Sequence, residues 1–195
     1  MNTATDNRIF DLWPTTFLYY APDGHEKRQS DLVTLALQNP EADILSGDDS
    51  AVLWLNAEIN EAVGEYLKRY AGAVVENFKT LAHTVISEHS DYQPLINHPD
   101  AYLSGIYYVT VPTDIRENHH RNDVKSSAIS FSDPRFAMNM GAIANDPYMD
   151  WHKVVRPKAG RLLIWPSFVD FFIHPNLSAS KQISIHLKIL VGGHQ

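Results

Sequence analysis

The 195-residue chain contains no cysteine. This absence excludes disulfides, thiolate metal sites, iron–sulfur clusters and a cysteine nucleophile, so any metal must be held by histidine, carboxylate or other oxygen donors. The chain also lacks the run of about 20 apolar residues that a membrane span needs, and its first residues show neither the basic region nor the apolar run of a signal peptide. We therefore expect a cytosolic (cytoplasmic) protein with no membrane partner.

An excess of positive charge is also missing. The chain has 16 Lys and Arg against 23 Asp and Glu, which gives a formal net charge of −7. Dispersed basic residues offer no electrostatic surface for a phosphate backbone, so we expect no nucleic acid partner. No linker divides the sequence, which predicts one domain over residues 1–195, with helical support over 1–82 and a β core over 83–191. A homodimer is left open.

The first part of the chain is predicted to be helical. Between 50 and 70, apolar residues recur at three- and four-residue intervals, which places one buried stripe on an amphipathic helix. A shorter helix is predicted from Ser30 to just before Asn39, and another around 74–81. Residues 10–20 are predicted to form a peripheral strand.

From residue 84 onward, short segments rich in β-formers alternate with proline-containing turns. This texture is typical of an antiparallel sandwich or barrel, so the predicted fold class is mainly β with helices first. The segment 116–125, which contains His119 and His120, is predicted to be a long loop. The predicted strands cover 84–87, 103–111, 128–131, 154–155, 161–165, 171–173 and 183–191.

Ten histidines are the residues from which a metal site would be built. His98 and Asp100 lie two residues apart on an extended segment, so their side chains point to the same side, as in ligand pairs of non-haem iron enzymes. His174, at the end of a predicted strand, becomes a candidate ligand if another donor converges on it. Each also has a simpler interpretation, because the same spacing occurs by chance in solvated loops and a histidine before Pro175 is often a loop residue.

The last strand shows the clearest pattern in the sequence. It alternates with period two, so that Ile183, Ile185, Leu187 and Ile189 share one face and Gln182, Ser184, His186 and Lys188 share the other. The apolar face predicts contact with a hydrophobic core. The polar face either meets solvent or lines a cavity.

Several motifs, taken in order, resemble a known family. They are similar to the Fe(II)/2-oxoglutarate oxygenases of the small bacterial and phage type, and the resemblance covers roughly 84–189. It implies a double-stranded β-helix, or jelly roll, whose open mouth holds a metal and its cosubstrate. The motifs are Tyr92, His98 to Pro112, Phe131 to Arg135, Gly160 to Phe168, Pro175-Asn176 and Gln182 to Ile185.

The same resemblance reveals substitutions at functional positions. It places Ile96 and His98 at the two metal-binding histidines and Phe171 at the distal histidine. The family arginine, which holds the far carboxylate of 2-oxoglutarate, falls on Gln182, and glutamine cannot form a charge-assisted bidentate pair. Fe(II) or another divalent transition metal would therefore need a rearranged ligand set, and the use of 2-oxoglutarate is in doubt.

Our leading hypothesis is an oxygenase-like oxidoreductase that modifies a small-molecule substrate through a rearranged metal site. Gln182 and Ser184 would then bind the cofactor, because they share the inward direction of the family arginine. The candidate metal ligands are His98, Asp100, His174 and His186.

Two alternatives stay open. The first is a metal-independent enzyme in which His186 and Lys188 are the acid–base groups and Tyr107 or Tyr108 lies nearby. The second is a non-catalytic binding protein with a vestigial pocket. The inward direction of His186 and Lys188 is the assumption on which all rebuilt-pocket hypotheses depend.

Overall fold

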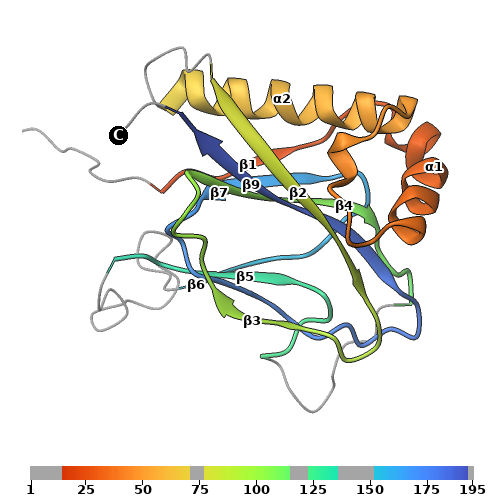
Figure 1. Ribbon diagram of the computed structural model, residues 1–195. Coiled ribbons are helices and arrows are strands. Elements are labelled where there is room, and N and C mark those ends of the chain that lie inside the picture. The colour runs from red at the N-terminus through yellow and green to blue at the C-terminus, as the bar shows by residue number, and fades with distance from the viewer. Residues whose placement is uncertain (1–14, 71–76, 115–122, 136–151, 193–195) are drawn as a thin grey trace, which may run out of the picture.

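The computed structural model describes residues 15–70, 77–114, 123–135 and 152–192. Its elements form three layers, in which two helices cover one face of a five-stranded sheet and a four-stranded sheet packs below the other face (Figure 1). The elements are β1 (Leu18–Tyr20), α1 (His25–Gln38), the short 3-10 helix η1 (Ile44–Ser46), α2 (Ser50–Tyr70), β2 (Phe78–Ser87), β3 (Gln93–Ile96), β4 (Leu103–Thr110), β5 (Ile129–Ser132), β6 (His152–Val155), β7 (Leu162–Pro166), β8 (Phe171–Ile173) and β9 (Gln182–Val191).

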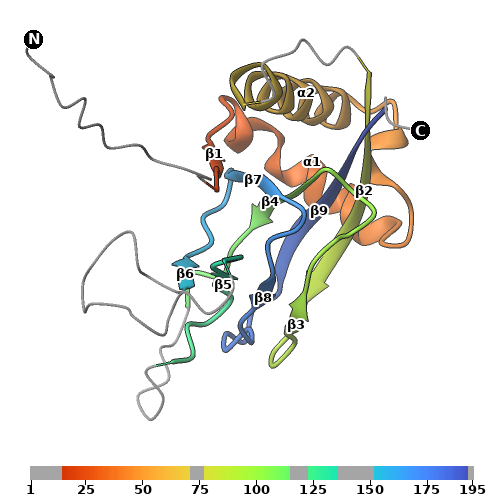
Figure 2. The same ribbon diagram turned by 90° about the vertical axis from the view of Figure 1, so that its left-hand side faces the viewer.

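The two sheets have the strand orders β1-β7-β4-β9-β2 and β3-β8-β5-β6, and every described strand pair is antiparallel. Two antiparallel sheets that face each other and exchange strands in this way form a jelly roll, which confirms the predicted fold class. The strands β2 and β3 follow each other along the chain, and each forms an edge of its sheet (Figures 1 and 2).

The long helix α2 has the residues 50–70 that its apolar periodicity predicts. Asp49 Oδ1 accepts the N–H of Ala51 at 2.8 Å, which satisfies one of the free donors of the first turn. Lys68 and Arg69 in the last turn lie where cations favour the helix dipole. The helix buries Leu55, Ile59, Val63 and Leu67 in a cluster with the apolar residues of the five-stranded sheet, and this cluster is the larger of two cores.

A second core lies between the two sheets. Three of its aromatic members, Trp165, Phe171 and Phe131, are at most 2% exposed, and their rings meet in edge-on or tilted contacts with centroids 5.0 to 6.4 Å apart. Such geometry is the preferred arrangement of aromatic pairs. Ile106 and Tyr108 complete this cluster from β4.

Helix α1 begins at His25, five residues before the predicted start. Gly24 precedes it with φ 88°, a left-handed conformation, and no side chain caps the helix, so the usual sequence signal for a helix start is missing. The His25 ring contacts the sheet through a 2.6 Å hydrogen bond between Nδ1 and the Tyr107 hydroxyl. A Cβ at Gly160 would lie 2.7 Å from the same ring, so this glycine permits the close approach of helix and sheet.

Two other predictions need correction. The predicted helix at 74–81 is wrong where it can be checked, because residues 78–81 begin the long strand β2, and 71–76 lie outside the described residues. Strand β3 was not predicted, since its sequence QPLI contains a proline and has only four residues. Most of the predicted loop 116–125 also lies outside the described residues.

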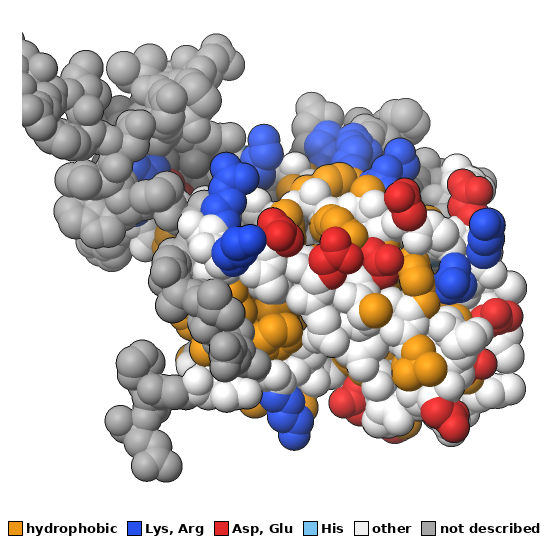
Figure 3. Space-filling model, turned by 90° about the horizontal axis from the view of Figure 1, so that it is seen from above, with side chains coloured by type: hydrophobic (Ala, Val, Ile, Leu, Met, Phe, Trp, Pro, Cys, Tyr) orange, Lys and Arg blue, Asp and Glu red, His pale blue; other side chains and the backbone are white. Residues whose placement is uncertain are grey.

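The helical layer is the molecular face seen in Figure 3. On its described part, acidic and basic side chains both occur, interspersed with apolar ones. Neither described helix has the length and apolar character that crossing a bilayer would require.

Candidate functional site

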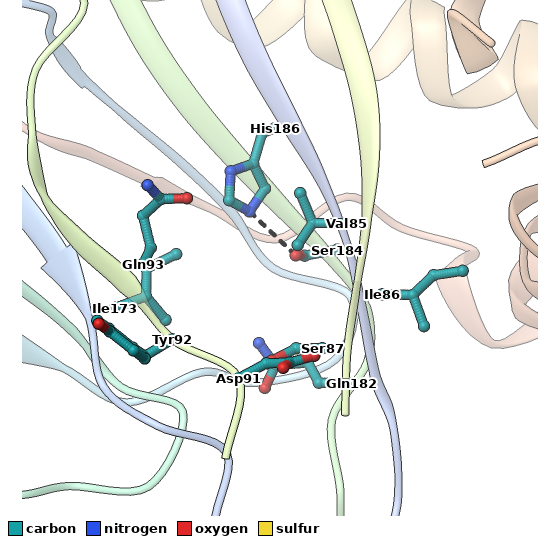
Figure 4. Close-up of a pocket in the computed structure, with 10 residues that line it drawn as sticks. All are labelled: Val85, Ile86, Ser87, Asp91, Tyr92, Gln93, Ile173, Gln182, Ser184 and His186. Atoms are coloured by element: carbon teal, nitrogen blue, oxygen red, sulfur yellow. Dashed lines mark hydrogen bonds between the residues drawn. The ribbon is translucent and has the colours of Figure 1, made fainter. Parts of the chain in front are cut away.

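A cavity of about 240 Å³ lies between the edges of the two sheets (Figure 4). Strands β9 and β2 form one wall, and β3 and β8 contribute to the opposite wall. The side chain of Ile86 points away from the other lining residues, toward the core beneath the helices. The lining residues are Val85, Ile86, Ser87, Asp91, Tyr92, Gln93, Ile173, Gln182, Ser184 and His186.

The polar face of β9 points into this cavity. Gln182, Ser184 and His186 are 3%, 2% and 7% exposed, so the polar alternation of the last strand faces a cavity wall and not bulk solvent. Lys188 continues the same face beyond the cavity. Its Nζ lies 3.2 and 3.3 Å from the two carboxylate oxygens of Asp100, and the pair is partly exposed.

His186 is a neutral hydrogen-bonding group. Its Nε2 lies 3.1 Å from Ser184 Oγ, and its ring stands 5.2 Å from that of His83, its register partner on β2. Burial is the main cause that lowers the pKa of His186 to about 3, and the positive charges that His83 and His98 can carry contribute to the same shift. A base with so low a pKa is poorly matched to proton transfer at neutral pH.

Gln182 carries the most unusual polar atom of the cavity wall. Its Oε1 is buried and has no hydrogen-bond partner among the described residues. Its register partner across the β2–β9 pair is Ser87, which also lines the cavity. A buried carbonyl oxygen without a donor is costly, which makes it a natural contact for a bound donor.

The three positions that the family resemblance assigns to metal ligands meet in the structure. Ile96 and Phe171 are direct register partners on β3 and β8, and the rings of His98 and Phe171 lie 5.6 Å apart. Ile96 and Phe171, however, both belong to the apolar cluster between the sheets. Because isoleucine and phenylalanine offer no lone pair, the residues at these positions do not fit an iron ion, and His98 is the single ligand type left there.

His98 is held by a chain of hydroxyl groups. Its Nδ1 lies 2.8 Å from Ser104 Oγ, which lies 2.8 Å from Ser167 Oγ, and both serines are buried. Burial, followed by the charge of Lys188, lowers the pKa of His98, while Asp100 raises it. The imidazole lines a second cavity of about 260 Å³, next to Tyr102 and Phe168.

The structure does not bring the four predicted metal ligands together. In the ranges that the structure describes, no three His, Asp or Glu side chains are grouped so that they could hold a metal. Asp100 lies in an exposed turn, bonded to Lys188. His174 uses both ring nitrogens: Nδ1 accepts the N–H of Lys125 at 3.3 Å, and Nε2 lies 2.8 Å from Ser130 Oγ.

The predicted acid–base groups are also separated. Tyr108 is buried in the apolar cluster, which raises the pKa of its hydroxyl, and it does not line the cavity. Tyr107 points to the helical side, where it meets His25. Of the predicted residues, only Gln182, Ser184 and His186 share one cavity wall.

Sequence reasoning missed His83 and the opposite wall of the cavity. His83 lies on β2, and because residues 74–81 were assigned to a helix, the alternation of His83, Val85 and Ser87 was not extended into a full strand. Gln93 and Asp91 lie on and before the unpredicted β3. The β-branched residues Thr80, Thr84, Val85 and Ile86 were the available signal for a longer β2.

Comparisons with known proteins agree with the jelly-roll fold. No curated protein matches the sequence. Among solved structures, the chain is similar to a Pseudomonas putida prolyl-4-hydroxylase at 12% identity, with a TM-score of 0.60 and coverage of 91% of this chain and 88% of that chain. It is similar to HygX from Streptomyces hygroscopicus, solved with nickel and 2-oxoglutarate bound, at 11% identity, with a TM-score of 0.57 and coverage of 90% and 81%.

A third similar structure is SnoN, a non-heme alpha-ketoglutarate-dependent epimerase from nogalamycin biosynthesis, at 10% identity, with a TM-score of 0.59 and coverage of 89% of this chain and 78% of that chain. Identities this low show a shared fold alone. The family described as "Putative 2OG-Fe(II) oxygenase" matches residues 82–187, which is more than half of the chain. The protein therefore belongs to the 2OG-Fe(II) oxygenase family.

Proposed function

We propose that this member of the family is a small-molecule-binding protein that does not use Fe(II) and 2-oxoglutarate at the family's usual positions. The observation that carries the proposal is the direct pairing of Ile96 with Phe171, where two of the three ligands would meet. Hydrocarbon side chains fill this place and pack with the core between the sheets. Iron held by His98 alone would lack the ligand set that positions it.

The polar cavity beside this apolar contact supports a binding role. Three polar side chains of β9 are at least nine-tenths buried in its wall. Burying polar groups costs free energy unless they are hydrogen-bonded, so a cavity that served only packing would be expected to carry apolar residues here. The unpaired Oε1 of Gln182 is better explained by a ligand that donates a hydrogen bond to it.

An acid–base enzyme has less support than a binding protein. The low pKa of His186 makes it a weak base, and the ammonium of Lys188 contacts Asp100 outside the cavity. The rearranged iron site, which was the leading hypothesis from the sequence, is not supported, because no three potential metal ligands are grouped among the described residues.

Anaerobic titration with Co(II) tests the proposal. We expect no d–d absorption band from the wild-type protein, and a band of one-to-one stoichiometry from the double variant Ile96→His/Phe171→His, in which His98 is joined by two further imidazoles. Adding His98→Ala to the double variant should abolish the new band. Circular dichroism and denaturant unfolding establish that each variant is folded.

Two results would overturn the proposal. The first is stoichiometric Co(II) or Fe(II) binding by the wild-type protein, with a charge-transfer band when 2-oxoglutarate is added. The second is a folded double variant that binds no Co(II), because the three positions would then not form the family's metal site.

A further inference from the structure

The cavity wall indicates the chemical class of the bound molecule. We infer that the cavity between β9 and β3 binds a small uncharged ligand that carries a carboxamide, or a similar group that both donates and accepts hydrogen bonds. This inference rests on the proposed binding function and deepens it. It concerns the end of the cavity formed by Gln182 and Ser184, where the family resemblance would place a carboxylate held by arginine.

The charges around the cavity disfavour an anion. The described lining residues include no lysine or arginine, and Asp91 is the one formally charged group among them. The nearest lysine in sequence, Lys181, directly precedes β9, does not line the cavity and pairs with Glu88 at 2.7 Å. A carboxylate placed here would lose its hydration without gaining a cation.

A cation is also disfavoured at the inner end. Asp91 is exposed, and its Oδ2 already accepts the N–H of Glu88 at 2.8 Å. The buried wall offers an amide, a hydroxyl and an imidazole that burial keeps neutral. A buried ammonium group would therefore have no carboxylate partner at that depth.

A carboxamide matches what the wall leaves unpaired. The free Oε1 of Gln182 needs a donor, and the amide of the same side chain supplies a donor in return, so two amides can exchange a pair of hydrogen bonds. Ser184 Oγ can donate to His186 Nε2 and still accept from a ligand. Val85 and Ile173 offer apolar contacts to a short carbon chain.

The size of the cavity limits the ligand. Drug-sized ligands occupy pockets of roughly 300 to 1,000 Å³, and the cavity here is smaller, at about 240 Å³. A five-carbon chain with one polar group at each end is therefore a suitable probe. Three such molecules share the five-carbon chain and differ in their end groups: glutaramide has two neutral carboxamides, glutarate has two carboxylates and 1,5-diaminopentane has two ammonium groups.

Isothermal titration calorimetry with these three probes at pH 7 tests the inference. We expect wild-type protein to bind glutaramide at least about tenfold more tightly than glutarate or 1,5-diaminopentane, since one unpaired buried hydrogen-bonding group is worth about this factor. Gln182→Met should weaken glutaramide binding by about tenfold, because methionine keeps the shape and removes the amide. Gln182→Arg should reverse the preference in favour of glutarate.

The matched control is Lys181→Met, which changes the adjacent residue outside the cavity lining and should leave the preference for glutaramide unchanged. The inference is overturned if glutarate or 1,5-diaminopentane binds wild-type protein most tightly, or if folded protein shows no saturable binding of any probe. Co(II) titration of the same sample separates this failure from failure of the proposed function. Metal binding would contradict the latter, whereas wrong probe selectivity without metal binding contradicts the ligand class alone.

Discussion

The interior of the jelly roll has two halves with opposite chemistry. Between β4, β7, β5, the start of β8 and the end of β3 it is filled by aromatic and aliphatic side chains, whereas beside β9, β2 and the start of β3 it is hollow and lined by polar groups. The boundary runs between neighbouring strands, because Ile106 on β4 is the register partner of His186 on β9. The two halves also divide the family's functional positions: Ile96 and Phe171 lie in the filled half, and Gln182 lies in the hollow half.

This division shows that the departures from the family pattern have different structural results. At the metal positions, the substituted side chains are absorbed into a packed core. At the arginine position, the substituted side chain stays in a cavity wall with an unsatisfied oxygen. We therefore expect substitutions in the filled half to cause large losses of stability and substitutions in the hollow half to cause small ones.

The largest effect is expected from Phe171→Ala in the filled half. Phe171 is 2% exposed and contacts the rings of Trp165 and His98, so its truncation should lower the free energy of unfolding by about 3 to 5 kcal/mol. Urea denaturation measures this loss. Gln182→Ala is the comparison from the hollow half, where an existing cavity only grows, and a similar loss there would show that the two halves are not different in packing.

An intermediate effect is expected from pH. Burial lowers the pKa of His186 from 6.5 to about 3 in the folded protein, so the unfolded chain binds more protons between these values. The contribution of His186 to stability is therefore complete above about pH 6.5 and decreases as the pH falls toward 3. Between pH 7 and pH 5 the loss from this histidine should be about 2 kcal/mol.

Other histidines add to the same trend, since desolvation also lowers the pKa of His25, His83, His98 and His174. Comparison with His186→Gln isolates the contribution of one ring, because glutamine can still bond to Ser184 and does not titrate. The wild-type protein should lose more stability than the variant between pH 7 and pH 5. Equal pH dependence of the two unfolding free energies would mean that His186 is not buried as described.

The smallest effect is expected from the ion pair between Lys188 and Asp100. The Lys188–Asp100 pair is exposed to solvent, and such pairs contribute little to stability. Lys188→Met should leave the thermal midpoint unchanged within experimental error and should not alter the binding of glutaramide. A clear loss of glutaramide binding in this variant would mean that the ammonium group of Lys188 contributes to the binding cavity.

Local periodicity predicted the elements whose sequence pattern is long. The stripe of α2 and the alternation of β9 extend over many residues, and both the element and its buried face follow from them. The inward direction of His186 is a consequence of that alternation. The four-residue strand β3 and the uncapped start of α1 carry no comparable signal.

The candidate site was harder to predict because it depends on contacts between distant segments. The pairing of Ile96 with Phe171 is set by strand register, which no local pattern contains. The sequence spacing disfavours pairing His174 with the family's distal position: His174 lies three residues after Phe171, so continued alternation places the two side chains on opposite faces. In the structure, the His174 ring forms hydrogen bonds with Ser130 and Lys125, which agrees with a direction away from the side of Phe171.

The helices and the five-stranded sheet share a core that extends beyond the part of the chain matched by the family model. The family match starts at residue 82, after both described helices and four residues into β2. Ile183, Ile185 and Leu187 are covered by the helices that lie outside the match. A fragment cut at the match boundary would expose this row of apolar side chains to water, and exposed apolar patches of this kind promote aggregation. The helices before residue 82 therefore protect the sheet from aggregation, although they lie outside the family match.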